Sequence, residues 1–81
     1  MRVYLNGESK DLEESSTLLD LVNELQLPSS RIAIELNRNV VRRRDWEGTT
    51  LNENDRIEVV HFVGGGAVKT RVESVANTYP R

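Results

Sequence analysis

The sequence predicts an α+β domain in which a mixed sheet of four to five strands packs on one helix. Two observations indicate this fold class. Several short runs alternate apolar and polar residues, as half-buried strands do, and one segment repeats its apolar residues at helical spacing. The expected order is strand, strand, helix, strand, strand, strand, which favours one sheet with a helix on one face. With 81 residues, the chain is expected to form one small core.

The first two strands are predicted by a hairpin signal near the N-terminus. Residues 3–5 alternate apolar and polar side chains, and Asn6-Gly7 follows at once. An Asn-Gly pair favours a type I′ turn because both central residues of that turn need positive φ. We therefore expect one strand to about Asn6 and a second, more polar strand over residues 8–12.

One helix is predicted between Thr17 and Pro28. Its apolar residues fall on one stripe, at Leu18, Leu21, Val22 and Leu25. Ser16 or Thr17 can cap the N-terminus, and Asp20 lies in the first turn, where a carboxylate interacts favourably with the helix dipole. Pro28 is expected to stop the helix because proline disfavours helical backbone in the residue before it.

Three further strands are predicted after the helix. They cover residues 31–37, a short run from Val40, and residues 56–62. The first and last strands of the chain are expected to lie side by side in the middle of the sheet, since both are strongly apolar. Trp46 is the only tryptophan, and its large apolar area predicts that it closes the core as a lid.

The last strand also predicts a surface for partners. If Ile57 and Val59 face the helix, the alternation turns Val60 and Phe62 to the other face. Large apolar side chains that point outward near the end of the domain suit docking, so Val60 and Phe62 are candidate docking residues, and Val63 beside the glycines is a further candidate. Cover by loops is the alternative.

Three consecutive glycines, Gly64-Gly65-Gly66, follow that strand. We expect them to leave the sheet, because glycine loses more backbone entropy on ordering than any other residue. A backbone without side chains can thread a channel too narrow for other residues, and at an extended reach of about 3.3 Å per residue Val63 to Gly66 spans roughly 13 Å. This suits a carrier whose own C-terminus is the reactive group. On glycine content alone, a flexible linker to residues 67–81 is the alternative.

Composition excludes several functions. The chain has no cysteine and one histidine, so we expect no disulfide, no metal site and no catalytic residue. A formal charge of −2 and a pI near 5.4 argue against nucleic-acid binding. The arginine run 42–44 is followed by Asp45 and Glu47, and is interpreted as a solvated edge, with partner docking as the alternative. No apolar run reaches the length of a membrane span or resembles a signal peptide, so we expect a cytoplasmic protein without membrane contact.

The domain ends in a specific motif, Asp-Arg-Ile-Glu-Val-Val-His-Phe-Val-Gly-Gly-Gly, whose last residue is Gly66. With this motif and the segments 3–7, 17–21, 32–37, 40–41, 44–46 and 54–66, the chain resembles the ThiS family of sulfur carriers over residues 1–66. Members of that family have the ubiquitin-like β-grasp fold and serve thiamine biosynthesis.

By this resemblance, Gly66 is the residue that carries sulfur. Its α-carboxylate is adenylated with ATP by a ThiF-type enzyme, converted to a thiocarboxylate, and used by a ThiG-type thiazole synthase for the thiazole of thiamine. Gly64 and Gly65 give the passage through a channel. The carrier then binds no cofactor and supplies no acid, base or nucleophile, so the resemblance implies a protein co-substrate and not an enzyme.

Residues 67–81 depart from the family's pattern, because its carriers usually end at the glycines. With a peptide bond after Gly66, no free carboxylate exists there. The tail is then a propeptide for a processing peptidase, an artefact of gene prediction, or a sign that the glycines are vestigial. The expected organisation is a domain over residues 1–63, a carrier terminus over 64–66 and a tail over 67–81 that is disordered, marginally structured or removed.

Two other functions stay open. A sulfur carrier of another pathway, such as the small subunit of molybdopterin synthase, shares fold and chemistry, although the ending from His61 to Gly64 favours the thiamine carriers. The third function is a ubiquitin-like interaction domain without conjugation. In that case the tail and the surface of Val60 and Phe62 bind a partner.

Overall fold

The structure, a computed structural model, describes residues 1–63 and 68–71, with side chains described through His61. The described residues form one helix, six strands and two short 3-10 turns. In chain order, the elements are β1 (Arg2–Leu5), β2 (Glu8–Asp11), α1 (Leu18–Leu25), a 3-10 turn (Ser29–Arg31), β3 (Ile32–Leu36), β4 (Asn39–Val41), a 3-10 turn (Arg43–Asp45), β5 (Arg56–Val63) and β6 (Val68–Arg71).

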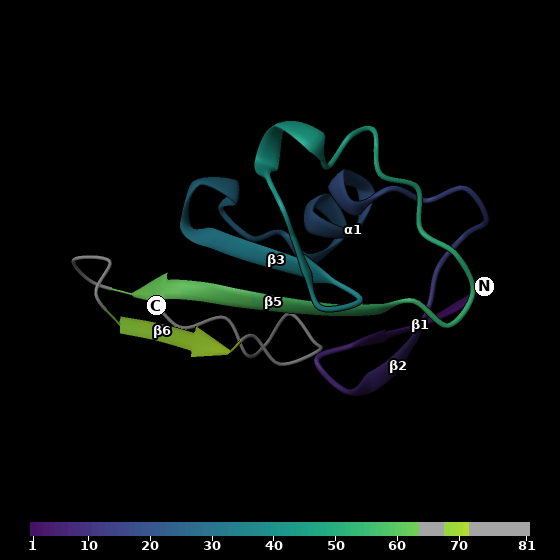
Figure 1. Ribbon diagram of the computed structural model, residues 1–81, viewed down its shortest axis with the longest axis horizontal. Coiled ribbons are helices and arrows are strands. Elements are labelled where there is room, and N and C mark those ends of the chain that lie inside the picture. The colour runs from purple at the N-terminus through teal and green to yellow at the C-terminus, as the bar shows by residue number, and fades with distance from the viewer. Residues whose placement is uncertain (64–67, 72–81) are drawn as a thin grey trace.

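The sheet has the strand order β2-β1-β5-β3-β4, and β6 pairs with β5 in addition. β1 runs parallel to β5, whereas every other pair of neighbouring strands is antiparallel. Figure 1 shows α1 on one side of this sheet, with β5 as the long strand through its middle. The prediction of a mixed sheet on one helix is confirmed, including the central pairing of the first strand with the strand 56–63.

The hairpins β1–β2 and β3–β4 turn through residues with positive φ. Asn6 and Gly7 connect β1 to β2 with φ of 50° and 88°. Asn37 and Arg38 connect β3 to β4 with φ of 51° and 74°. Positive φ at two successive residues is the requirement of a type I′ turn, so the Asn-Gly prediction is confirmed and a second turn of the same kind is formed without glycine.

The helix begins with a capping box. Thr17 accepts a hydrogen bond from the Asp20 backbone N–H (3.1 Å), and the Asp20 carboxylate accepts one from the Thr17 N–H (2.9 Å). The helix ends at Leu25, where Gln26 adopts left-handed backbone with a φ of 59°. It therefore stops three residues ahead of Pro28, because the left-handed residue already reverses the chain.

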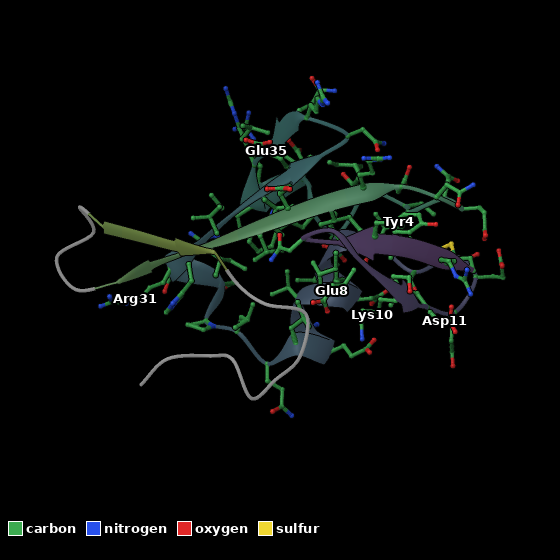
Figure 2. The ribbon with its side chains drawn as sticks, turned by 90° about the horizontal axis from the view of Figure 1, so that it is seen from below. Tyr4, Glu8, Lys10, Asp11, Arg31 and Glu35 are labelled. Atoms are coloured by element: carbon green, nitrogen blue, oxygen red, sulfur yellow. The ribbon has the colours of Figure 1, made fainter. Side chains whose placement is uncertain are left out.

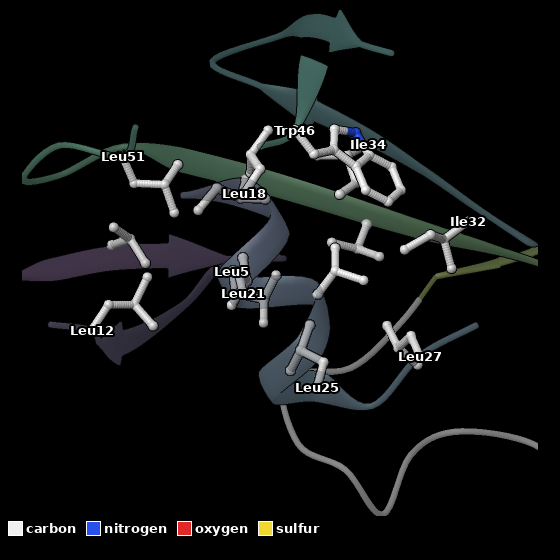
Figure 3. Packing of buried hydrophobic residues seen from close by; sticks show 14 residues of the cluster. Leu5, Leu12, Leu18, Leu21, Leu25, Leu27, Ile32, Ile34, Trp46 and Leu51 are labelled. Atoms are coloured by element: carbon white, nitrogen blue, oxygen red, sulfur yellow. The ribbon is translucent and has the colours of Figure 1, made fainter. Parts of the chain in front are cut away.

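The core lies between α1 and the sheet (Figure 3). Its buried apolar residues are Val3, Leu5, Leu12, Leu18, Leu21, Val22, Leu25, Leu27, Ile32, Ile34, Trp46, Leu51, Ile57 and Val59. Trp46 is 1% exposed and donates a hydrogen bond from Nε1 to the Val41 carbonyl at 3.0 Å, which confirms it as a lid with its polar edge satisfied.

The strand β6 lies within the expected tail of residues 67–81. The sequence predicts a tail that is disordered, marginally structured or removed, and the structure describes residues 68–71 of it, which pair antiparallel with residues 60–63. The physical reason is an available sheet edge: β1 ends at Leu5, so it leaves the second half of β5 open on that side. Residues 64–67 and 72–81 lie outside the described residues.

Candidate functional site

The predicted carrier terminus follows directly after β5. Gly64, Gly65 and Gly66 lie outside the described residues, so their threading role stays a prediction. The structure does describe the strand that leads to them, up to Val63.

β5 is held on both of its edges. On one edge it pairs antiparallel with β3 over five residue pairs, from Leu36 opposite Ile57 to Ile32 opposite His61. On the other edge its first residues pair parallel with β1. Its helix-facing residues Ile57, Val59 and His61 are at most 5% exposed. Pairing on both edges and burial of one face fix the position of the chain up to His61.

Two turn asparagines fix the backbone of β5. The Asn37 Oδ1 accepts a hydrogen bond from the Arg56 N–H (2.9 Å), and the Asn37 N–H donates to the Arg56 carbonyl (2.7 Å). Asn6 does the same further along: its N–H donates to the Ile57 carbonyl (2.8 Å), and its Oδ1 accepts from the Val59 N–H (2.9 Å). Each hairpin turn therefore also anchors the strand that carries the terminus.

Sequence reasoning assigned Asn6 only to its turn and missed this second role. The residue type of Asn6 is the signal for this role, because a side-chain amide offers an acceptor oxygen and N–H donors, as a peptide group does. At a type I′ turn beside a neighbouring strand, it can continue the backbone ladder by one residue. Nothing in the local sequence says which strand lies there, because Val59 is 53 residues away.

The face of the sheet away from α1 contains the candidate docking residue Val60. Its alternation with buried Ile57 and Val59 places Val60 there, half-buried and opposite Ala33 of β3. The predicted orientation of Val60 thus agrees with the burial of its neighbours. Phe62 and Val63 continue β5, but their side chains lie outside the described ones, so their docking role stays a prediction.

This open face is mixed in character. Glu35 and Glu58 lie directly opposite each other on β3 and β5, and Val40, 72% exposed, lies opposite Glu35 on β4. Figure 2 shows Tyr4 and Glu35 on the side of the sheet away from the helix, whereas Lys10 points toward α1, where it forms an ion pair with Glu24 at 2.8 Å. The face therefore combines apolar and acidic side chains.

A hollow of about 290 Å³ lies where β1 meets β5, lined by Tyr4, Gly7, Arg56, Ile57 and Glu58. Within residues 1–61, no group of three or more His, Asp and Glu side chains is arranged to hold a metal ion. In the described part of the chain, no helix has the length and apolar character needed to cross a membrane.

Comparison with known proteins finds relatives of the domain, and one family model includes the three glycines in its match. The ThiS family model matches residues 3–66, which include the three glycines and exclude β6. The sulfur carrier protein ThiS of Bacillus subtilis is 35% identical over 65 residues, which cover 79% of this chain and 98% of that protein.

Two further proteins share this region. A thiazole synthase of Magnetococcus marinus is 42% identical over 66 residues, 82% of this chain, and the chain spans only 20% of that protein's length. The crystal structure of the thiamine biosynthesis protein ThiS from Geobacter metallireducens superposes with a TM-score of 0.72 at 29% identity, covering 82% of this chain and all of that one.

These matches agree with the architecture described above. A sheet of this strand order on one helix, with parallel β1 and β5 at its centre, is the ubiquitin-like β-grasp that the sequence predicts. The family match continues from this domain into Gly66, the residue predicted as the carrier terminus. The chain therefore belongs to the ThiS family.

Proposed function

We propose that the chain is a sulfur carrier of thiamine biosynthesis whose reactive group is the α-carboxylate of Gly66. The observation that carries this proposal is the family match over residues 3–66, which joins the described domain to the three glycines. The relative in Bacillus subtilis that bears the name sulfur carrier protein ThiS is matched over nearly its whole length, which supports the same role here.

The chemistry takes place on enzymes that act on the carrier. A carboxylate is a poor electrophile at neutral pH. Transfer of AMP from ATP to the Gly66 carboxylate, with release of pyrophosphate, gives an acyl adenylate with a good leaving group. Hydrosulfide then attacks the acyl carbon, the bond to AMP breaks, and a thiocarboxylate and free AMP are formed. A ThiF-type enzyme would catalyse the activation, so ATP is the partner's substrate and not a cofactor of this chain.

The domain's contribution is to hold and present the terminus. Its backbone is fixed through β5 as far as the buried His61, so the residues beyond start from a fixed point. From Val63, the glycines reach roughly 13 Å in extended conformation, enough to enter a channel in a partner. The face that contains Val60 lies beside that exit and is the surface on which we place the docking of partners.

The receiving enzyme is proposed to be a ThiG-type thiazole synthase. The support is that proteins named thiazole synthase contain a region similar to this chain, at 42% identity in the Magnetococcus marinus protein. We place the carrier in the cytoplasm, where ATP for its activation is available. A processing peptidase is needed wherever residues 67–81 are present in the initial product.

The proposal is tested by the mass of the protein isolated from its own cells under conditions that preserve a thiocarboxylate. A species that ends at Gly66, with sulfur in place of one oxygen, is the expected result. In vitro, a chain that ends at Gly66 should form an adenylate with a ThiF-type enzyme and ATP, while the matched chain that ends at Arg81 should not. Equal adenylate formation by both chains, or by neither, would contradict the assignment of Gly66.

A further inference from the structure

The second half of β5 has a different neighbour from the first half. β1 pairs with β5 only as far as Leu5 opposite Ile57, and the Asn6 side chain extends that ladder to Val59. From Val60 to Val63, the same edge is paired with β6 (Figure 1). This stretch is called the distal edge of β5 below.

The direction of the backbone groups identifies which residues open onto the distal edge. The N–H and C=O groups of successive residues in a strand point to opposite edges. Those of Val59 face Asn6, since its N–H donates to the Asn6 Oδ1 and its carbonyl accepts from the Asn6 Nδ2 (3.4 Å). The groups of His61 and Val63 therefore face β6, where Thr70 and Val68 are their register partners.

Without β6, the distal edge would present two donors and two acceptors in strand geometry. Unpaired backbone groups on a sheet edge are a template for another strand. The edge belongs to the part of the chain that matches the family, up to Gly66, whereas β6 lies beyond that match. The acceptor edge is thus a feature of the carrier domain, and the strand that covers it is an addition.

We propose that the distal edge of β5 is a docking site for an extended strand of the protein that activates the carrier, paired antiparallel in the place of β6. The identity of that partner rests on the proposed function. Four residues of this chain already pair there, which shows that the edge accepts a strand of this length and direction. Backbone pairing gives affinity without requiring particular side chains, as in other strand-addition complexes.

The position of the edge gives this docking mode a purpose. His61 and Val63, whose backbone groups face the distal edge, lie directly before the glycines in the sequence. A partner strand bound there fixes the backbone next to Gly64, and thereby the direction in which the terminus leaves the domain. In the chain that ends at Arg81, β6 occupies the site and excludes the partner's strand.

A matched pair of proline variants of the full chain tests whether the edge is covered by β6. Thr70 is the register partner of His61, whose backbone groups face β6, so the Thr70 N–H faces His61, while the Lys69 N–H faces away from β5. Thr70→Pro removes a ladder donor, whereas Lys69→Pro keeps the ladder. By amide hydrogen exchange, Thr70→Pro should lose protection at His61 and Val63, and Lys69→Pro should not. Val59, held by Asn6, is the internal control and should stay protected in both.

The second measurement adds the ThiF-type enzyme without ATP. The Thr70→Pro chain should bind it more tightly than the unchanged chain and the Lys69→Pro chain, and binding should restore protection at His61 and Val63. A chain that ends at Gly66 should behave like Thr70→Pro. Such a chain is expected to fold, because the whole Geobacter metallireducens ThiS chain superposes on 82% of this chain.

The outcomes separate this proposal from the proposed function. Exposed His61 and Val63 amides in the bound complex would overturn the docking site, and so would absence of binding by any of these chains. If the chain ending at Gly66 is adenylated while those amides stay exposed, the carrier function stands and the docking site is wrong. If the amides are protected but no adenylate forms when ATP is added, the docking site stands and the carrier function is wrong.

Discussion

The side-chain amide of Asn6 binds both backbone groups of Val59, as a neighbouring strand would. The Asn6 Oδ1 accepts from the Val59 N–H at 2.9 Å, and the Asn6 Nδ2 donates to the Val59 carbonyl at 3.4 Å. Val59 is fully buried, so water does not replace these bonds. A single turn residue thereby ends the pairing of β1 and fixes the point where the distal edge of β5 begins.

Replacing Asn6 by glycine should reveal the contribution of this contact. Asn6→Gly keeps the positive φ that the turn needs but leaves two buried backbone groups of Val59 without partners. We expect a loss of about 2–3 kcal/mol in the free energy of unfolding, measured by urea denaturation, with faster amide exchange at Val59.

The matched control is Asn54→Gly. Asn54 also has positive φ, 71°, and its exposed side chain makes no hydrogen bond to another described residue. The same substitution there should change stability by less than about 0.5 kcal/mol. Equal losses at Asn6 and Asn54 would mean that the Asn6 contact contributes nothing beyond the turn.

The turn between β3 and β4 should be improved by glycine. Arg38 adopts a φ of 74°, which is costly for a residue with a Cβ atom, and its side chain is exposed. Arg38→Gly creates an Asn-Gly turn at this position and removes the strain of the positive φ. Glycine also gives the unfolded chain more conformational entropy, which offsets part of this gain, so we expect a net stabilisation of about 0.5–1 kcal/mol. An unchanged or lower thermal midpoint would show that the Arg38 backbone is not strained.

The two faces of the sheet should respond differently to loss of an apolar side chain. Ile34 on β3 is 1% exposed, so Ile34→Ala should lower stability by about 2–5 kcal/mol through lost burial and a cavity. Val40 on the neighbouring β4 is 72% exposed, and Val40→Ala should cost less than about 0.5 kcal/mol. The comparison is made by denaturant unfolding. Similar losses would show that the buried and open faces are assigned wrongly.

Most of the domain could be predicted because its signals are local. The alternation in β1, β3 and β5, the leucine stripe of α1 and the Asn-Gly turn each arise from neighbouring residues, and the structure confirms them. The order of the central strands followed from their apolar content. The helix end at Gln26 was less predictable, since a left-handed glutamine carries no strong sequence signal.

The features that the sequence did not predict depend on where strands end in space. The contact of Asn6 with Val59 joins residues 53 positions apart, and β6 pairs with β5 only because β1 stops short of the distal edge. Neither arises from a local pattern. The candidate docking residue Val60 could be placed because alternation along β5 decides its face. For residues 64–66, the glycine pattern left a carrier terminus and a linker open, and only the resemblance favoured the carrier.

The three glycines are proposed to thread a narrow channel in a partner, which makes the size of residue 65 decisive. A methyl group at residue 65 widens the backbone where the terminus must enter a partner, so Gly65→Ala in a chain that ends at Gly66 should lower adenylation by a ThiF-type enzyme far more than it lowers the thermal midpoint. Gly48→Ala is the matched control. A Cβ at Gly48 meets nothing nearer than the Asp45 carbonyl oxygen at 3.9 Å, so neither folding nor adenylation should change. If Gly65→Ala leaves adenylation intact, or impairs it only in proportion to unfolding, the glycines serve as a flexible connection and their cross-section is irrelevant.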